Sequence, residues 1–179
     1  MKKMLTVSIV MAILFLSPML SGQNKDAVFL SPADFLEDPY GGGNFDYNDG
    51  DYIHCTLGIT PEARTIYAPL HLPHGSVIDT IQLYFMDGSL GALAIRLVRR
   101  NFTVGLNDVI TQTDDIMFEQ STAEIDLTNY YVYTWDKNFI TYRQVKPKGR
   151  RYWVEITFPD TSIYGRVIGV KVMYWRPTW

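Results

Sequence analysis

The chain has 179 residues, of which 16 are basic, 19 are acidic, three are histidines and one is a cysteine. Its net charge of −3 argues against general nucleic-acid binding, which depends on summed positive charge. The single cysteine, Cys55, excludes an intramolecular disulfide, and we expect it to act as a small buried apolar residue.

The first 22 residues have the layout of a secretory signal peptide. Two lysines open the chain, an apolar run covers residues 4–16, and the small pair Ser21-Gly22 precedes Gln23. Pro18 interrupts the helix, and the apolar run is shorter than the ~20 residues that span a membrane. We therefore expect an exported protein, located in the periplasm, at the cell surface or in the medium. A retained N-terminal anchor is the alternative.

Cleavage after Gly22 leaves 157 residues, the size of one domain with an adequate core. Without its two N-terminal lysines the chain has 14 basic and 19 acidic residues, a net charge of −5. The sequence divides into a signal peptide (1–22), an N-terminal extension with a Gly/Asp-rich loop (23–50) and a folded domain (51–179). In the extension, residues 31–36 predict one N-capped helical turn.

Residues 38–51 form a long irregular segment with a candidate calcium site. Calcium takes six to eight oxygen ligands, and this loop supplies oxygens from four residues beside Gly50. The spacing is one residue short of an EF-hand loop, so a Gly/Asn/Asp surface turn is the other interpretation. The candidate ligands are Asp46, Asn48, Asp49 and Asp51.

Zinc would need imidazole or thiolate ligands, which His54, His71, His74 and Cys55 could supply. His71 and His74 are three residues apart, which places them on opposite faces of a strand. His74 also lies in a Pro-His-Gly turn, which explains its position without a metal. We expect no cofactor, with calcium as the open exception.

Apolar residues alternate with polar ones at several places along the rest of the chain, as in half-buried strands. The clearest early strands cover residues 66–72, 78–86 and 91–99, the last two predicted as a hairpin around Asp87-Gly88. Shorter strands follow at 125–127, 131–133 and 139–145. The clearest alternations are 152–158 and 168–174. The pattern predicts an all-β fold: a single antiparallel β-sandwich or jelly roll.

Part of this pattern resembles a type of exported bacterial β-sandwich domain. In that type, a strand ending L-P-x-G turns into a strand ending in Asp, and the next strand ends in Arg. The matching stretches are Ala68–Ile78 (APLHLPHGSVI), Tyr84–Asp87 (YFMD), Leu97–Arg99 (LVR) and the alternations at 152–156 and 170–174. The resemblance implies the fold and no catalytic residue.

The two last strands predict an outward-facing aromatic platform. If Tyr152, Val154, Ile156 and Phe158 face the core together with Ile168, Val170, Val172 and Tyr174, their neighbours face outward. An antiparallel pair matching Phe158 to Ile168 and Val154 to Val172 sets Glu155 beside Lys171, Trp153 beside Met173 and Arg151 beside Trp175. Exposed tryptophans on a sheet face need a cover: a sugar, a partner protein or the chain's own N-terminal segment. The candidate binding residues are Trp153, Trp175, Arg151 and Met173.

One basic cluster lies just before these strands. Its members are either a solvated turn or a contact for an anionic glycan or a phosphate-bearing surface. They are Lys146, Lys148, Arg150 and Arg151.

No catalytic motif of the nucleophile-elbow, zinc-protease or phosphate-loop kind is present in the sequence. Acidic pairs exist at Asp114-Asp115 and at Asp34 with Glu37, and a cross-strand carboxylate pair could be hidden in the fold. We expect a non-catalytic module that binds or assembles at the cell surface or outside the cell. Its partner would be a glycan or a protein, not nucleic acid; after cleavage it spans no membrane, and homo-oligomers remain open. The alternative is a secreted glycosidase-like hydrolase.

Overall fold

The structure, a computed structural model, describes residues 24–37, 45–48, 51–55, 64–86, 92–104, 110–122, 130–146, 150–159 and 165–177. The expected signal peptide lies outside these residues, as do Asp49, Lys148, the 125–127 strand and the turn at Asp87-Gly88. In the described part of the chain, no helix is both long enough and apolar enough to cross a membrane.

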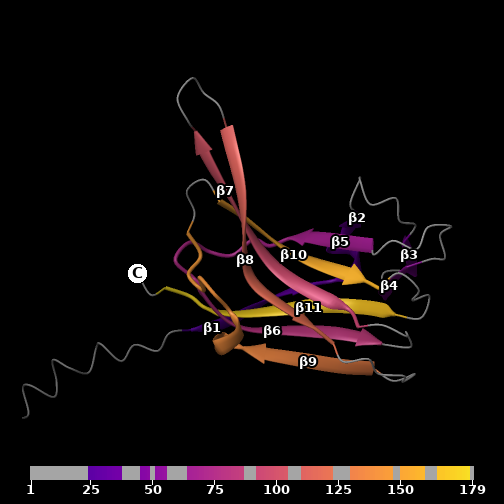
Figure 1. Cartoon of the computed structure of the whole chain (residues 1–179). Coiled ribbons are helices and arrows are strands. Elements are labelled where there is room, and N and C mark those ends of the chain that lie inside the picture. Colours follow the sequence, from indigo (N-terminus) through magenta and orange to yellow (C-terminus); the bar gives the residue numbers. More distant parts are fainter. Residues whose placement is uncertain are drawn as a thin grey trace, which may run out of the picture.

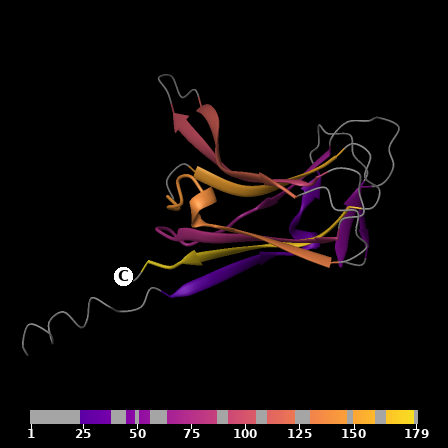
Figure 2. The same cartoon turned by 60° about the horizontal axis from the view of Figure 1, so that its bottom comes forward.

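Two antiparallel sheets stack face to face (Figures 1 and 2). Sheet A has the order β3-β4-β11-β6-β9, with β1 also paired to β11, and sheet B has the order β2-β5-β10-β7-β8. The predicted all-β fold is confirmed. The strands are β1 (Lys25–Leu30), β2 (Leu36–Glu37), β3 (Phe45–Asn48), β4 (Tyr52–Cys55), β5 (Arg64–Pro69), β6 (Val77–Met86), β7 (Ala94–Val104), β8 (Ile110–Ser121), β9 (Tyr130–Asp136), β10 (Arg150–Phe158) and β11 (Arg166–Trp175).

The core lies between the two sheets and is built by alternate side chains of the long strands. From β10 the buried residues are Tyr152, Val154, Ile156 and Phe158, the inward face expected from the sequence. They are packed in one cluster with apolar side chains of sheet A, among them Ile81, Leu83, Phe85, Val170 and Val172. Because side chains of a strand alternate in direction, the other half of each strand faces away from the core.

The predicted hairpin of the two last strands is wrong. β10 lies between β5 and β7 in sheet B, whereas β11 pairs with β6, β1 and β4 in sheet A. Val154 therefore faces Ala68 and Leu97, and not Val172. The alternation identified the buried face of each strand correctly. Two apolar faces that oppose each other across a core, however, show the same sequence pattern as two that lie side by side.

The predicted hairpin of residues 78–86 and 91–99 is wrong for the same reason. β6 pairs with β9 and β11, and β7 pairs with β8 and β10, so the chain passes from sheet A to sheet B between them. β7 also continues past the expected end at Arg99 to Val104, and it rises with β8 beyond the body of the sandwich (Figure 1).

One inward position in β11 was also assigned to the wrong residue. Val167 is fully buried, whereas Ile168 is only half-buried. The register against β6 shifts between Val167 and Gly169, and such an irregularity moves the following side chains to the other face. The alternation from Val170 onward is as expected.

The segment that the sequence separated as an extension contributes to both sheets. β1 pairs with β11 from Lys25 opposite Trp175 to Leu30 opposite Val170, while β2 pairs with β5. Between them, the predicted turn is a single 3-10 turn, Pro32–Asp34, and the Asp34 carboxylate accepts hydrogen bonds from the Ser31 backbone N–H (2.7 Å) and hydroxyl (2.8 Å). The weak strand expected at 139–145 is wrong: a second 3-10 turn covers Lys137–Phe139, and after it only Gln144 forms an isolated bridge, with Val77.

Candidate functional site

An open groove of about 1030 Å³ lies on sheet B, at the end where β5 finishes. Its floor is made by side chains of β5, β10 and β7 that point away from the core. Its walls are the segments before β6 and before β10. The lining residues are Tyr67, Pro69, Leu70, His71, Leu72, His74, Arg100, Phe102, Val145, Arg150, Arg151, Tyr152, Trp153 and Glu155.

The local sequence explains why the groove opens here. The β5 ladder ends at Pro69, which has no N–H to donate, and the Leu70 N–H then bonds to the Tyr152 carbonyl (2.8 Å). The chain turns at Gly75, whose φ of 78° suits glycine, and its N–H donates to the Val145 carbonyl (3.0 Å). These bonds hold the wall carrying His71 and His74 against the wall before β10.

Trp153 lies in the middle of the floor, between Pro69 of β5 and Val98 of β7. Its Nε1 donates to Oε1 of Glu155 (2.6 Å), the next outward residue of β10. On its ring lies the guanidinium of Arg100, 4.6 Å from the ring centroid. The half-buried indole is thus held in one orientation at the surface of the groove.

Arg100 is itself fixed by an acidic residue of the neighbouring strand. Its Nε and Nη2 donate to the two carboxylate oxygens of Asp114 in β8, each at 2.7 Å. This hydrogen bonding, assisted by the charges of Asp114 and Glu155, raises the pKa of Arg100. The guanidinium on Trp153 is therefore a permanent charge in a two-pronged ion pair.

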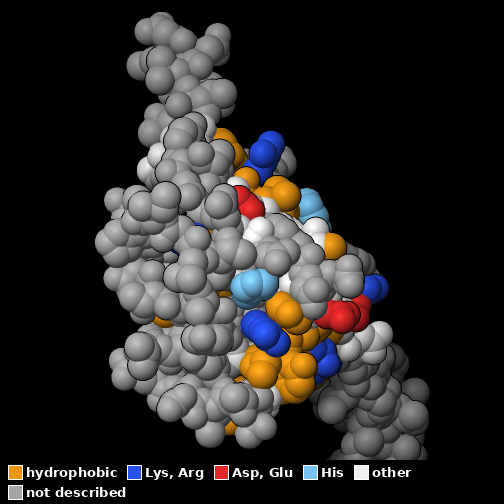
Figure 3. Space-filling model, turned by 90° about the vertical axis from the view of Figure 1, so that its right-hand side faces the viewer, with side chains coloured by type: hydrophobic (Ala, Val, Ile, Leu, Met, Phe, Trp, Pro, Cys, Tyr) orange, Lys and Arg blue, Asp and Glu red, His pale blue; other side chains and the backbone are white. Residues whose placement is uncertain are grey.

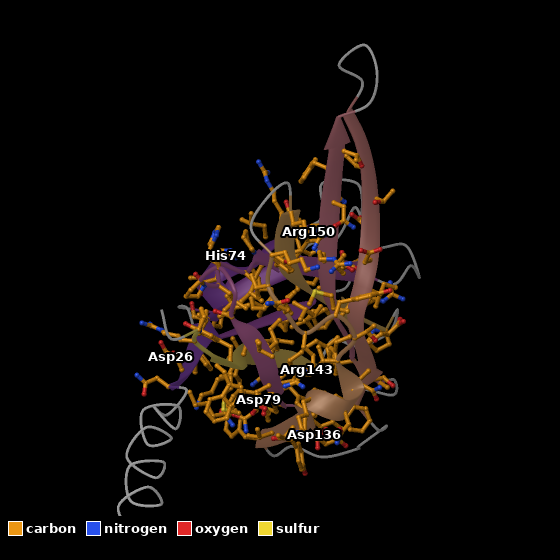
Figure 4. The ribbon with its side chains drawn as sticks, turned by 90° about the vertical axis from the view of Figure 1, so that its left-hand side faces the viewer. Asp26, His74, Asp79, Asp136, Arg143 and Arg150 are labelled. Carbon is orange, nitrogen blue, oxygen red and sulfur yellow. The ribbon has the colours of Figure 1, made fainter. Side chains whose placement is uncertain are left out.

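Arg150 and Arg151 begin β10 at one end of the groove. Arg151 is exposed, stands opposite Arg100 and places its guanidinium 5.5 Å from the ring centroid of Phe102. The Nη1 of Arg150 is buried and has no hydrogen-bond partner among the described residues. In Figure 4, Arg150 and His74 appear on the same side of the molecule, in agreement with their place in the same groove lining.

The acidic pair Asp114-Asp115 does not act as a pair. Asp114 accepts hydrogen bonds from Arg100 on the outer face. Asp115 instead accepts from Arg99, whose Nε lies 3.1 Å from Oδ2. Hydrogen bonds from Arg99 first, and then from Asn101, lower the pKa of Asp115. Each carboxylate of this pair is thus held by a different arginine.

The structure does not bring the four expected platform residues together. Trp153 and Arg151 line the groove on sheet B, while Trp175 and Met173 belong to β11 of sheet A. The expected contacts of Trp153 with Met173, of Arg151 with Trp175 and of Glu155 with Lys171 are consequently wrong. Trp175 instead lies between Lys25 of β1, whose Nζ is 5.5 Å from the ring centroid, and Val77 of β6.

The candidate metal ligands are scattered or lie outside the described residues. Among the described side chains, no three of the His, Cys, Asp and Glu type gather as a metal site. Asp46 and Asn48 are in β3, Asp51 is exposed in the turn before β4, and Asp49 is not described. His54 is in β4, whereas His71 and His74 belong to the wall of the groove.

The other end of the sandwich, where β3 and β4 lie, has a mixed surface. Its described side chains include hydrophobic, basic and acidic ones close together (Figure 3). Among the described residues, the groove on sheet B combines a hollow with a held aromatic ring, and we take it as the candidate binding site.

Comparisons with known proteins give only loose structural likenesses. No protein-family model matches the chain, and no curated protein matches it in sequence. An isomalto-dextranase from Arthrobacter globiformis complexed with panose has a TM-score of 0.46 and 11% identity, covering 84% of this chain and 23% of its own. The CBM22-1–GH10 modules of Clostridium thermocellum xylanase 10B, complexed with xylohexaose, have a TM-score of 0.46 and 8% identity, covering 88% and 29%.

A third solved structure is matched over nearly its whole length. The C-terminal CBM6 of a laminarinase from Zobellia galactanivorans has a TM-score of 0.41 and 9% identity, and the match covers 82% of this chain and 98% of that one. This chain spans only about a quarter of the length of the first two proteins. Because every one of these TM-scores is below 0.5, the site has to be interpreted from its own residues.

The sequence pointed to Trp153, Arg150, Arg151 and Glu155, and to His71 and His74 only as metal candidates, but not to Tyr67, Arg100 or Phe102. Tyr67, Arg100 and Phe102 stand at outward positions of their strands, so the alternation could have shown that they face away from the core. It could not show that β5 and β7 flank β10, which is the fact that makes these residues neighbours.

Proposed function

We propose that this protein is an exported, non-catalytic β-sandwich that binds a glycan in the groove over Trp153. The observation that carries the proposal is the held, half-buried indole in an open groove that also contains Tyr67, Phe102 and several charged side chains. Sugar rings present an apolar C–H face and a rim of hydroxyls. An aromatic floor with a few fixed polar groups suits both parts of such a ligand.

The described residues of the groove favour binding over hydrolysis. Glycoside hydrolysis by the common mechanisms uses two carboxyl groups about 5–10 Å apart on either side of the scissile bond. Glu155 is the one acidic residue of the described lining, and it already accepts the Trp153 indole N–H. Asp114, the nearby acid on β8, is held by Arg100.

The export expected from the sequence agrees with the same proposal. The first 22 residues read as a signal peptide, and removing them would place the groove in the periplasm, at the cell surface or in the medium, where polysaccharides are available. The mature chain would begin near Gln23. A protein partner at the cell surface remains the alternative ligand for the same groove.

The two outward tryptophans provide a matched test of glycan binding. Trp153→Ala removes the floor of the groove, whereas Trp175→Ala removes an indole of similar burial from the opposite sheet. After a microarray screen of neutral and acidic glycans, titration calorimetry should show that Trp153→Ala weakens binding at least about tenfold, as for a residue that dominates an interface. Trp175→Ala should bind as the unchanged protein does.

The melting temperature of each variant separates binding from folding. If Trp153→Ala unfolds the protein, Trp153→Phe keeps an aromatic ring and removes only the indole N–H and part of the area. It should then fold and bind more weakly than the unchanged protein. Equal binding by a folded Trp153 variant, or loss of binding by Trp175→Ala alone, would show that the glycan does not bind in this groove.

A further inference from the structure

The groove is basic although the protein is acidic. Arg100, Arg150 and Arg151 line it, against a single carboxylate from Glu155. The whole chain has a net charge of −3. A concentration of positive charge in a concave site of an acidic protein attracts anions locally and needs an explanation beyond solubility.

Two of these arginines face each other without a carboxylate between them. Arg151 stands directly opposite Arg100 in the β10–β7 ladder, and like charges in this position destabilise a sheet. Asp114 neutralises Arg100 from the β8 side. Arg151 forms no ion pair with any described residue.

Arg150 lies at the same end of the groove, but strand alternation directs its side chain to the face of Asn101, away from Arg151. Its Nη1 is shielded from water and lacks a partner among the described residues, so this atom is not presented to a ligand in the groove. The charge of Arg150 does contribute to lowering the pKa of Asp115. The Oδ2 of Asp115, however, already accepts from both Arg99 and Asn101.

Charge also varies along the groove in one direction. Glu155 lies four residues from Arg151 on the same face of β10, which is about 13 Å at the rise of a strand. Trp153 is midway between them. A ligand that packs against the indole would therefore have its negative end beside Arg151 and a neutral, hydroxyl-rich end beside Glu155 and Tyr67.

We propose that the ligand of the groove is an acidic glycan, whose anionic group binds Arg151, opposite Arg100, while an adjacent sugar ring packs against Trp153. This inference rests on the proposed function and names the class of glycan. A guanidinium presents parallel N–H donors that match the two oxygens of a carboxylate or of a sulfate ester. The anion supplies an acceptor for Arg151, which has no ion pair among the described residues, and relieves the repulsion between Arg151 and Arg100.

The test compares ligands that differ in charge alone. Oligogalacturonate and its methyl ester share one sugar chain, but the ester has no negative charge. We expect the full mature chain to bind oligogalacturonate at least about tenfold more tightly than the ester, and to lose this preference as sodium chloride is raised. Dextran sulfate and dextran form a second pair. A preference in the first pair assigns the anion to a uronate, a preference in the second to a sulfate ester, and either supports the proposal.

Matched variants place the charge in the groove. Arg151→Gln should weaken binding of the acidic ligand about tenfold and leave binding of its neutral counterpart unchanged, and Arg151→Lys, which keeps the charge but loses the forked donor set, should weaken it less. Lys171→Gln removes one positive charge from sheet A and should change neither affinity.

The outcomes also separate this inference from the proposed function. If neutral glycans bind as tightly as acidic ones and Trp153→Ala abolishes both, the groove binds glycans and the inference of an acidic ligand is wrong. If acidic glycans bind but Lys171→Gln weakens them as much as Arg151→Gln does, the attraction is general and the inference is again wrong. If no glycan of either kind binds, the proposed function fails, and the inference with it.

Discussion

At the scale of single residues, Gly169 shows how closely β1 approaches β11. A Cβ at this position would lie 2.6 Å from the Leu30 carbonyl oxygen and 2.6 Å from Cζ of Phe29, and the φ of 156° is unfavourable for other residues. The Phe29 ring crosses the space that glycine leaves free and makes an edge contact with Tyr84 of β6. Glycine is thus required here by close backbone approach.

We expect Gly169→Ala to lower the free energy of unfolding by about 1–3 kcal/mol, the usual cost of overpacking. Urea unfolding followed by tryptophan fluorescence measures this change. Adding Phe29→Ala removes the side-chain clash but not the clash with the Leu30 backbone, so the double variant should stay less stable than Phe29→Ala alone. Equal stability of these last two would show that the backbone is not the obstacle.

Asp79 of β6 stabilises sheet A, because its carboxylate contacts side chains of two other strands, Lys25 of β1 and Trp175 of β11. Its Oδ2 lies 2.7 Å from Lys25 Nζ of β1, and the carboxylate also lies near Arg143 (Figure 4). The hydrogen bond from Lys25, with others from Thr80 and Trp175, lowers the pKa of Asp79 below 3.8. The ionised form is therefore the one that the folded state stabilises.

A lowered pKa in the folded state means that the stabilisation is present above the unfolded value of about 3.8 and is lost as the pH falls through the folded value. We expect Asp79→Asn to lower the free energy of unfolding at neutral pH by about 1 kcal/mol, since Lys25 is partly exposed and its charge is screened. The difference between the two proteins should shrink below about pH 4. A difference that is the same at neutral and at acidic pH would show that the charge of Asp79 is not its source.

At the scale of elements, the sequence correctly predicted which side chains of a strand face the core. It did not correctly predict which strands lie beside one another. Residues 152–158 are buried and exposed in the expected order because a strand has a strict period of two. The strand partners are fixed by three-dimensional packing, and apolar residues such as Val154 and Val172 fit equally well beside each other or across a core. Ile168 shows a second limit, since an irregularity in register leaves no signal in composition.

The residues of the candidate site were likewise predictable within one strand but not between strands. Trp153 and Arg151 could be identified as outward residues from their own strand. Arg100 and Tyr67, which complete the groove, belong to strands separated from β10 by dozens of residues, and nothing in the sequence pattern places them beside it. The expected platform failed where it combined β10 with β11, because that step needed a strand partner rather than a face.

At the scale of the whole molecule, the sandwich separates two aromatic surfaces. Trp153 lies on the outer face of sheet B within a basic groove, and Trp175 lies on the outer face of sheet A beside Lys25 and Met173. The core separates these two surfaces, so an oligosaccharide bound on one of them does not contact the other. Trp175 can therefore serve as the control residue when binding at Trp153 is tested.

The central claim, that a glycan binds over Trp153, is tested most directly by the indole N–H signals of the protein in two-dimensional nuclear magnetic resonance. Replacing Trp153 and Trp175 one at a time with phenylalanine assigns their two signals. Titration with an acidic oligosaccharide should move the Trp153 signal in a saturable way and leave the Trp175 signal in place. A saturable shift of the Trp175 signal with no change at Trp153 would contradict the account.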